Sequence, residues 1–159
     1  MEKIEIFGEN RSEPFTKTRE GSRAVVIQDG KILLAHETVS DYWQLPGGGL
    51  EANESPEDCC VREAEEETGV LVTPVREALV ICEYYEEVRY INHYFVCKVA
   101  GRGKINLTER EKSRGLEPRW LPQQEAIDLF SRHRDFAIIN EDKRGTYLRE
   151  YTALDHLRS

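Results

Sequence analysis

Long hydrophobic runs, paired cysteines and an excess of basic residues are all missing from this chain of 159 residues. No apolar segment approaches the roughly 18–20 residues that a membrane-spanning helix needs, so no membrane contact is expected. The first residues, Met1 to Glu5, lack the apolar core of a secretory signal, which favours a cytoplasmic protein. A formal net charge of −8 excludes the basic face that wrapping a nucleic-acid polymer requires.

Cysteine is scarce, and its spacing does not match a metal-binding motif. The four cysteines are Cys59, Cys60, Cys82 and Cys97, and none forms a C-x-x-C pair. Zinc is therefore disfavoured, and reduced thiols acting as small buried hydrophobic residues are the expectation.

Length and patterning predict one domain spanning residues 1–159, with residues 1–20 and 136–159 at its periphery. Residues 9–20 and 101–115 are polar and read as loops, and the tail from 136 to 157 shows only helical fragments. Helices are expected at Pro56–Thr68 and from Pro122 onward, which together with the strands suggests a mixed sheet between helices. The predicted strands are Lys3–Phe7, Arg23–Ile27, Lys31–Ala35, Trp43–Leu45, Val75–Tyr85, Arg89–Val99 and Pro118–Leu121.

The helix at Pro56–Thr68 has clear start and stop signals. Ser55 is a good N-cap, Pro56 suits the first helical position, and Gly69 is a natural end. Glu63, Glu66 and Glu67 are spaced i, i+3 and i+4, so they share one helical face and repel one another. A cation or a basic partner is needed to compensate.

Hard carboxylate oxygens suit Mg²⁺, with Mn²⁺ as the alternative ion. The glycines Gly47 to Gly49 before the helix allow close backbone approach, so a carbonyl there is a further candidate ligand. Arg62 lies beside the carboxylate face and can pair with Glu54, which would tie the preceding loop to the helix.

The segment from Gly48 to Val70 resembles the box of the Nudix hydrolase superfamily, G-x5-E-x7-R-E-U-x-E-E-x-G-U with U aliphatic. Ala64 and Val70 fill the aliphatic places. The fixed positions are Gly48, Glu54, Arg62, Glu63, Glu66, Glu67 and Gly69.

The resemblance implies an α/β/α sandwich with a mixed β-sheet between helices. It also implies an enzyme, a pyrophosphohydrolase of MutT-like type acting on a nucleoside diphosphate linked to another moiety: a nucleoside triphosphate, a nucleotide sugar or a dinucleoside polyphosphate. Relatives are often homodimers. The implied metal ligands are Gly47 (through its carbonyl), Glu63, Glu66 and Glu67, with Arg62 and Glu54 supporting catalysis.

The general base stays open in the sequence. Glu63 is one candidate, and in some relatives the base comes from a loop outside the box. The acids available there are Glu109, Glu111 and Glu117.

Substrate-binding residues are less specific. By resemblance Arg23 lies where some relatives contact phosphate. Trp43, Tyr84 and Tyr94 are candidates for stacking on a base, although each could instead pack within the sheet. A Nudix-like module that senses a nucleotide without turnover is the alternative function.

Overall fold

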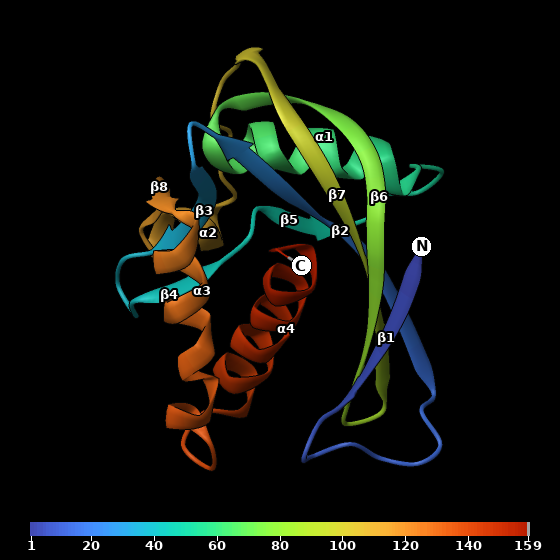
Figure 1. Ribbon diagram of the computed structural model, residues 1–159. Helices are drawn as coiled ribbons and strands as arrows, with labels where there is room; N and C mark the ends of the chain where they lie inside the picture. Colours follow the sequence, from blue (N-terminus) through green and yellow to red (C-terminus); the bar gives the residue numbers. More distant parts are fainter. Residues whose placement is uncertain (159) are drawn as a thin grey trace.

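A single mixed sheet is the centre of the fold in the computed structural model, which describes residues 1–158 (Figure 1). The strand order is β1-β6-β7-β2-β3-β4, with β5 paired to β2 and β8 paired to β3. The pairs β1/β6 and β2/β7 are parallel and the others are antiparallel. The strands are β1 (Glu2–Phe7), β2 (Lys17–Gln28), β3 (Lys31–Glu37), β4 (Tyr42–Gln44), β5 (Gly47–Gly49), β6 (Val70–Tyr85), β7 (Val88–Arg102) and β8 (Leu116–Pro122).

Helices cover both faces of this sheet. In Figure 1, α1 lies across the upper part of the long strands, while α3 and α4 lie below and to the left. The predicted α/β/α sandwich is confirmed. No helix among residues 1–158 has the length and apolarity to cross a membrane. The helices are α1 (Pro56–Thr68), α2 (Glu109–Ser113), α3 (Gln123–Ser131), a short 3-10 helix (Arg132–Phe136) and α4 (Glu141–Arg158).

Alternation along the strands divides the core into two clusters. Ala24 and Val26 of β2 pack with Cys60 and Ala64 of α1, whereas Val25 packs with the residues of α3 and α4. This follows from the period-2 geometry of a strand, which sends neighbouring side chains to opposite faces. The four cysteines are buried and form no disulfide, as predicted for small hydrophobic residues.

Helix α1 begins and ends where the sequence predicts. The Ser55 hydroxyl accepts a hydrogen bond from the Asp58 backbone N–H at 3.0 Å, and Gly69 ends the helix with φ of 74°. Ser22 of β2 donates to the Pro56 carbonyl at 2.6 Å. The helix that carries the carboxylates is therefore fixed to the sheet at its start.

Three predictions about the peripheral segments were wrong. β2 begins at Lys17, inside the expected loop 9–20, because its first half pairs with β7 from Val88 onward. The expected loop 101–115 contains α2, which Thr108 and Glu111 stabilise with a capping box.

The third correction concerns the tail, which was expected at the periphery. Helix α4 instead packs against the sheet and contributes Tyr147, Ala153 and Leu154 to the core. Its Arg149 and Glu150 are buried as an ion pair. The tail carried no readable apolar stripe because much of its buried face is polar or small.

Candidate active site

The glycine turn places backbone beside the acidic face of α1. β5 pairs with β2 so that Gly47 faces Arg23 and Gly48 faces Ser22. The Gly47 N–H donates to Oε1 of Glu67 at 2.8 Å. A Cβ on Gly48 would lie 2.5 Å from Oε1 of Glu63. A side chain on Gly48 would therefore displace the Glu63 carboxylate.

Two of the three predicted carboxylates, Glu67 and Glu63, lie against this turn, and Arg62 links Glu66 to Glu63. Their surroundings are unequal. Glu67 is 5% exposed, and burial raises its pKa well above the usual value, opposed by the charge of Arg23 and the Gly47 N–H. Burial also raises the pKa of Glu63, although the hydrogen bond from Arg62 opposes it. Glu66 is more exposed, at 34% of its side chain.

Arg62 holds the loop and the helix together. Its Nε donates to Oε2 of Glu54 at 2.7 Å and its Nη2 donates to Oε1 of Glu54 at 2.9 Å. The same Nη2 also donates to the Gly49 carbonyl at 3.1 Å. This bidentate pair lowers the pKa of Glu54 to about 2 and raises that of Arg62. The predicted pairing of these two residues is confirmed.

Arg62 also supplies positive charge to the repelling carboxylates. Its Nη1 donates to Glu63 at 2.9 Å and to Glu66 at 3.1 Å. Within residues 1–158, no three acidic, histidine or cysteine side chains converge on a point that a metal ion could occupy. The donor set nevertheless fits a hard divalent cation in kind, because the buried Glu67 and the partly buried Glu63 share a helix face with a third carboxylate, Glu66.

Of the three acids outside the box that were predicted as alternative bases, one, Glu111, lies near Glu63 and Glu67. Burial is the main cause of the raised pKa of Glu63 and Glu67, and the nearby carboxylate of Glu111 adds to both. The side chain of Glu109 is 93% exposed and pairs with Lys112. Glu117 is half exposed beside Arg119.

A cavity of about 350 Å³ opens next to the glycine turn. Arg23 lines it together with Gly48 and Gly49. Its Nη1 donates to Gln44 and to the Leu45 carbonyl, while its Nε has no hydrogen-bond partner among the described residues.

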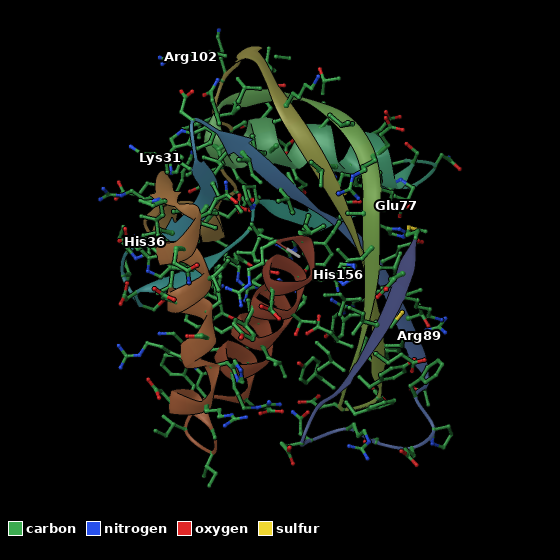
Figure 2. All side chains as sticks on the ribbon, in the orientation of Figure 1. Lys31, His36, Glu77, Arg89, Arg102 and His156 are labelled. Atoms are coloured by element: carbon green, nitrogen blue, oxygen red, sulfur yellow. The ribbon has the colours of Figure 1, made fainter. Side chains whose placement is uncertain are left out.

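The three aromatic candidates do not line this cavity. Tyr94 is fully buried and its hydroxyl donates to Glu150, so no surface is left for stacking on a ligand. Trp43 stacks on His36 with ring centroids 3.8 Å apart. His36 is labelled at the left of Figure 2, beside α3.

Tyr84 stacks on Phe7 with ring centroids 5.0 Å apart. It pairs with Arg89, whose label in Figure 2 marks the end of the hairpin farthest from α1. Substrate stacking by Trp43, Tyr84 or Tyr94 is therefore not supported by their positions.

Other residues take the place of these aromatic side chains. Tyr42 and Tyr90 line the cavity, and α4 adds Asp142, Thr146 and Arg149 to its wall. The tyrosines were visible in the sequence as strand aromatics, but nothing there separated them from the buried ones. Nothing in the sequence indicated that the α4 residues line a cavity, because this helix was not predicted.

A helix with a carboxylate face, fixed by an arginine clamp behind a glycine turn in an α/β/α sandwich, defines the class of Nudix hydrolases. Comparison with known proteins agrees. The NUDIX domain family model matches residues 18–139. The chain belongs to the Nudix hydrolase family, whose members include pyrophosphohydrolases.

Two curated relatives show the extent of the similarity. A CMP-5'-(N-acetyl-N-hydroxy-3-aminopropyl)phosphonate hydrolase of Streptomyces rubellomurinus is 33% identical over 117 residues, 69% of this chain and 54% of that protein. The chain therefore spans about half the length of that relative. A MutT-like protein of Streptomyces ambofaciens is 30% identical over 129 residues, 80% of this chain and 79% of that protein.

A solved structure shares the fold. A NUDIX hydrolase from Nitrosomonas europaea superposes with a TM-score of 0.60 and 22% identity, covering 86% of this chain and 90% of that one.

Proposed function

We propose that the protein is a Mg²⁺-dependent pyrophosphohydrolase that cleaves a nucleoside diphosphate linked to another moiety. The observation that carries the proposal is the shared face of α1 that presents Glu63, Glu66 and Glu67 beside a glycine turn, with Arg62 clamped to Glu54. Such an acidic face repels an anionic substrate unless a cation lies between them. The first relative is named for a CMP-linked substrate, which supports a nucleotide.

Glu63, Glu66 and Glu67 would hold the ion, with the carbonyl of Gly47 as a further ligand. When bound, a divalent cation neutralises phosphate oxygens and makes an adjacent water more acidic. Mn²⁺ has the same preference for oxygen and is the alternative ion. Arg62 would orient the carboxylates through its bonds to Glu63 and Glu66.

The remaining roles fall to residues around the ion. Arg23 lines the cavity beside the turn and would bind a phosphate oxygen. Glu111 would accept the proton of the attacking water, because its carboxylate lies near Glu63 and Glu67. Glu109 and Glu117 are too exposed and too occupied elsewhere to serve.

Hydrolysis of a panel of nucleoside triphosphates, nucleotide sugars and dinucleoside polyphosphates tests the proposal. We expect phosphate-containing products with Mg²⁺ and none with chelator. Glu66→Gln and Glu67→Gln should each lower kcat about 10²–10³-fold, because each removes a charged ligand. Ligand binding without any turnover would overturn hydrolysis and favour a nucleotide-sensing module.

Two further predictions belong to this function. A small enzyme of nucleotide metabolism is expected in the cytoplasm, which fractionation with an antibody tests. Its expected state is a homodimer, and sedimentation velocity of the purified chain distinguishes a dimer from a monomer.

A further inference from the structure

A second cavity continues the first one along α4. This cavity, of about 270 Å³, shares part of its wall with the cavity at the glycine turn, so the two form one groove between α4 and the β2–β7 part of the sheet. We call this space the α4 groove. The shared wall consists of Tyr90, Asp142, Thr146 and Arg149.

The charge of the α4 groove changes along its length. Its box end carries three arginines, Arg19, Arg23 and Arg114, against two carboxylates, Glu20 and Glu37. Glu37 pairs with Arg114 at 3.5 Å, so this end keeps an excess of positive charge. The far end beyond Thr146 carries four carboxylates against the single Arg149. These acids are Glu83, Glu86, Glu141 and Asp142.

The pairing within the far end leaves it negative. Arg149 binds Glu83 at 3.3 Å, and Arg144, behind the wall, binds Glu141 through two bonds of 2.5 and 2.7 Å. Glu86 and Asp142 remain as the excess acids. A second phosphorylated group would be repelled there, whereas an uncharged group with hydrogen-bond donors would not.

Two buried polar atoms of residues lining this end lack a hydrogen-bond partner among the described residues, the Tyr85 hydroxyl and Nη2 of Arg149. Arg149 has a side-chain exposure of 7%, and its Nε and Nη1 bind Glu150 and Glu83. Its Nη2 has no hydrogen-bond partner among the described residues, and an unpaired buried donor is costly. A hydrogen-bond acceptor bound in the α4 groove would supply the missing partner.

The aromatic surface is also at this position. Tyr90 is half buried, lines both cavities, and lies at a tilt to Tyr85 with ring centroids 6.3 Å apart. An aromatic ring of this kind offers a stacking face to a planar heterocycle.

From these observations we propose that the α4 groove binds the uncharged ring system of a nucleoside at its far end. Tyr90 provides the stacking face and Arg149 donates to an acceptor on the ring. The phosphates lie at the arginine-lined box end, so this orientation rests on the proposed function. It predicts substrates with one phosphate-rich end and one uncharged end, rather than rings that carry several phosphates.

Part of the wall that confers this preference lies on α4, which begins at Glu141, beyond the residues 18–139 that match the family model. Specificity would then depend on α4 outside the matched residues together with Tyr90 inside them, while the chemistry depends on the box.

Filling the groove tests the proposal directly. Thr146→Phe would place a ring where the two cavities meet, and Tyr90→Leu would remove the stacking face. We expect each variant to weaken binding of at least one of CMP, UMP, AMP and GMP by about tenfold in calorimetric titrations with Mg²⁺. Binding of inorganic pyrophosphate should change far less, because its site is at the box end. Because the two substitutions are made separately, the test remains valid if one of the variants fails to fold.

Reversing the charge of Asp142 gives a second, independent test. Asp142→Lys should strengthen binding of inositol hexakisphosphate at least fivefold, since it removes part of the repulsion at the far end. The matched control is Asp155→Lys on the same helix, where Asp155 pairs with Arg158 outside both cavities. Asp155→Lys should leave the binding of the nucleoside monophosphates and of inositol hexakisphosphate unchanged.

The outcomes separate the two proposals. If the wild type hydrolyses nothing but binds a nucleoside monophosphate in a Thr146- and Tyr90-dependent way, the hydrolase assignment fails and the α4 groove stands. If hydrolysis occurs but Thr146→Phe and Tyr90→Leu affect nucleotides and pyrophosphate equally, the α4 groove assignment is overturned. Tight binding of inositol hexakisphosphate by the wild type overturns it as well.

Discussion

The hydroxyl of Tyr94 donates to Oε1 of Glu150 at 2.6 Å, joining the centre of β7 to the middle of α4 inside the core. The other oxygen of Glu150 accepts the Leu45 N–H at 2.7 Å. Nε of Arg149 also donates to Oε1 of Glu150, at 3.0 Å. Burial alone would raise the pKa of Glu150, but the charges of Arg149 and Arg23 lower it, so the carboxylate is ionised in the core.

Breaking this buried group should cost more stability than breaking a surface pair. Glu150→Gln leaves the Arg149 charge partly uncompensated, and we expect a loss of about 3 kcal/mol in the free energy of unfolding. Urea denaturation followed by circular dichroism measures it. Asp155→Asn, which removes an exposed pair with Arg158, should cost less than about 1 kcal/mol. Equal losses in the two variants would contradict the structural role of Glu150.

The three glycines of β5 should respond differently to alanine. In Gly47→Ala the Cβ would lie 2.1 Å from the Ser22 carbonyl oxygen, so backbone must move and we expect a loss of about 2–4 kcal/mol in stability. In Gly48→Ala the nearest atoms belong to the flexible Glu63 carboxylate. That variant should fold but lose activity about tenfold or more, because a carboxylate is displaced from the site.

Gly49→Ala is the stability control of the series, since its Cβ would meet nothing nearer than 3.9 Å. Thermal unfolding should rank the variants with Gly47→Ala lowest and Gly49→Ala equal to wild type. A Gly48→Ala protein with full activity would show that the position of Glu63 does not matter for the reaction.

Acid should weaken the clamp between Arg62 and Glu54. The pKa of Glu54 falls from 4.5 to about 2 on folding, so between these values the unfolded chain binds more protons than the folded one. The clamp's stabilisation is therefore present above pH 4.5 and is lost as the pH falls toward 2.

Glu54→Gln should reduce the slope of stability against pH in that window, measured by urea unfolding at several acidic pH values. The control is Glu51→Gln. The side chain of Glu51 is 67% exposed, and its carboxylate comes no closer to Arg62 than 3.6 Å, so this pair is weak. If both variants keep the wild-type slope, the Glu54–Arg62 pair contributes nothing to acid unfolding.

The sequence predicted α1 and the glycine turn well because their determinants are local. Ser55, Pro56 and Gly69 fix the helix ends by themselves, and the spacing of Glu63, Glu66 and Glu67 fixes a shared face. The pairing of Arg62 with Glu54 also follows from one loop and one helix. None of these features requires knowing which distant segment lies nearby.

Helix α4 and the groove escaped prediction because their determinants are distant. Arg149 and Glu150 are charged residues that look exposed in sequence, and only Glu83, Tyr94 and the Leu45 N–H make their burial tolerable. The same distance explains Tyr94. Its strand position was clear, but its partner lies 56 residues later on an unpredicted helix.

The proposal that Glu111 is the general base gives a sharp kinetic prediction. Glu111→Gln should lower kcat about 10²–10³-fold, because Glu111 lies near Glu63 and Glu67 and a glutamine cannot accept the proton. The amide oxygen can still accept the Thr108 N–H, a bond of 2.9 Å in the wild type, so the α2 capping box survives. The loss should be in kcat rather than KM, and the acidic limb of the pH–rate profile should disappear.

The matched control is Glu109→Gln, two residues away with a 93% exposed side chain, which should behave as wild type. If Glu111→Gln keeps both its rate and the acidic limb of its profile, the base is Glu63 instead, and Glu111 serves only to cap α2.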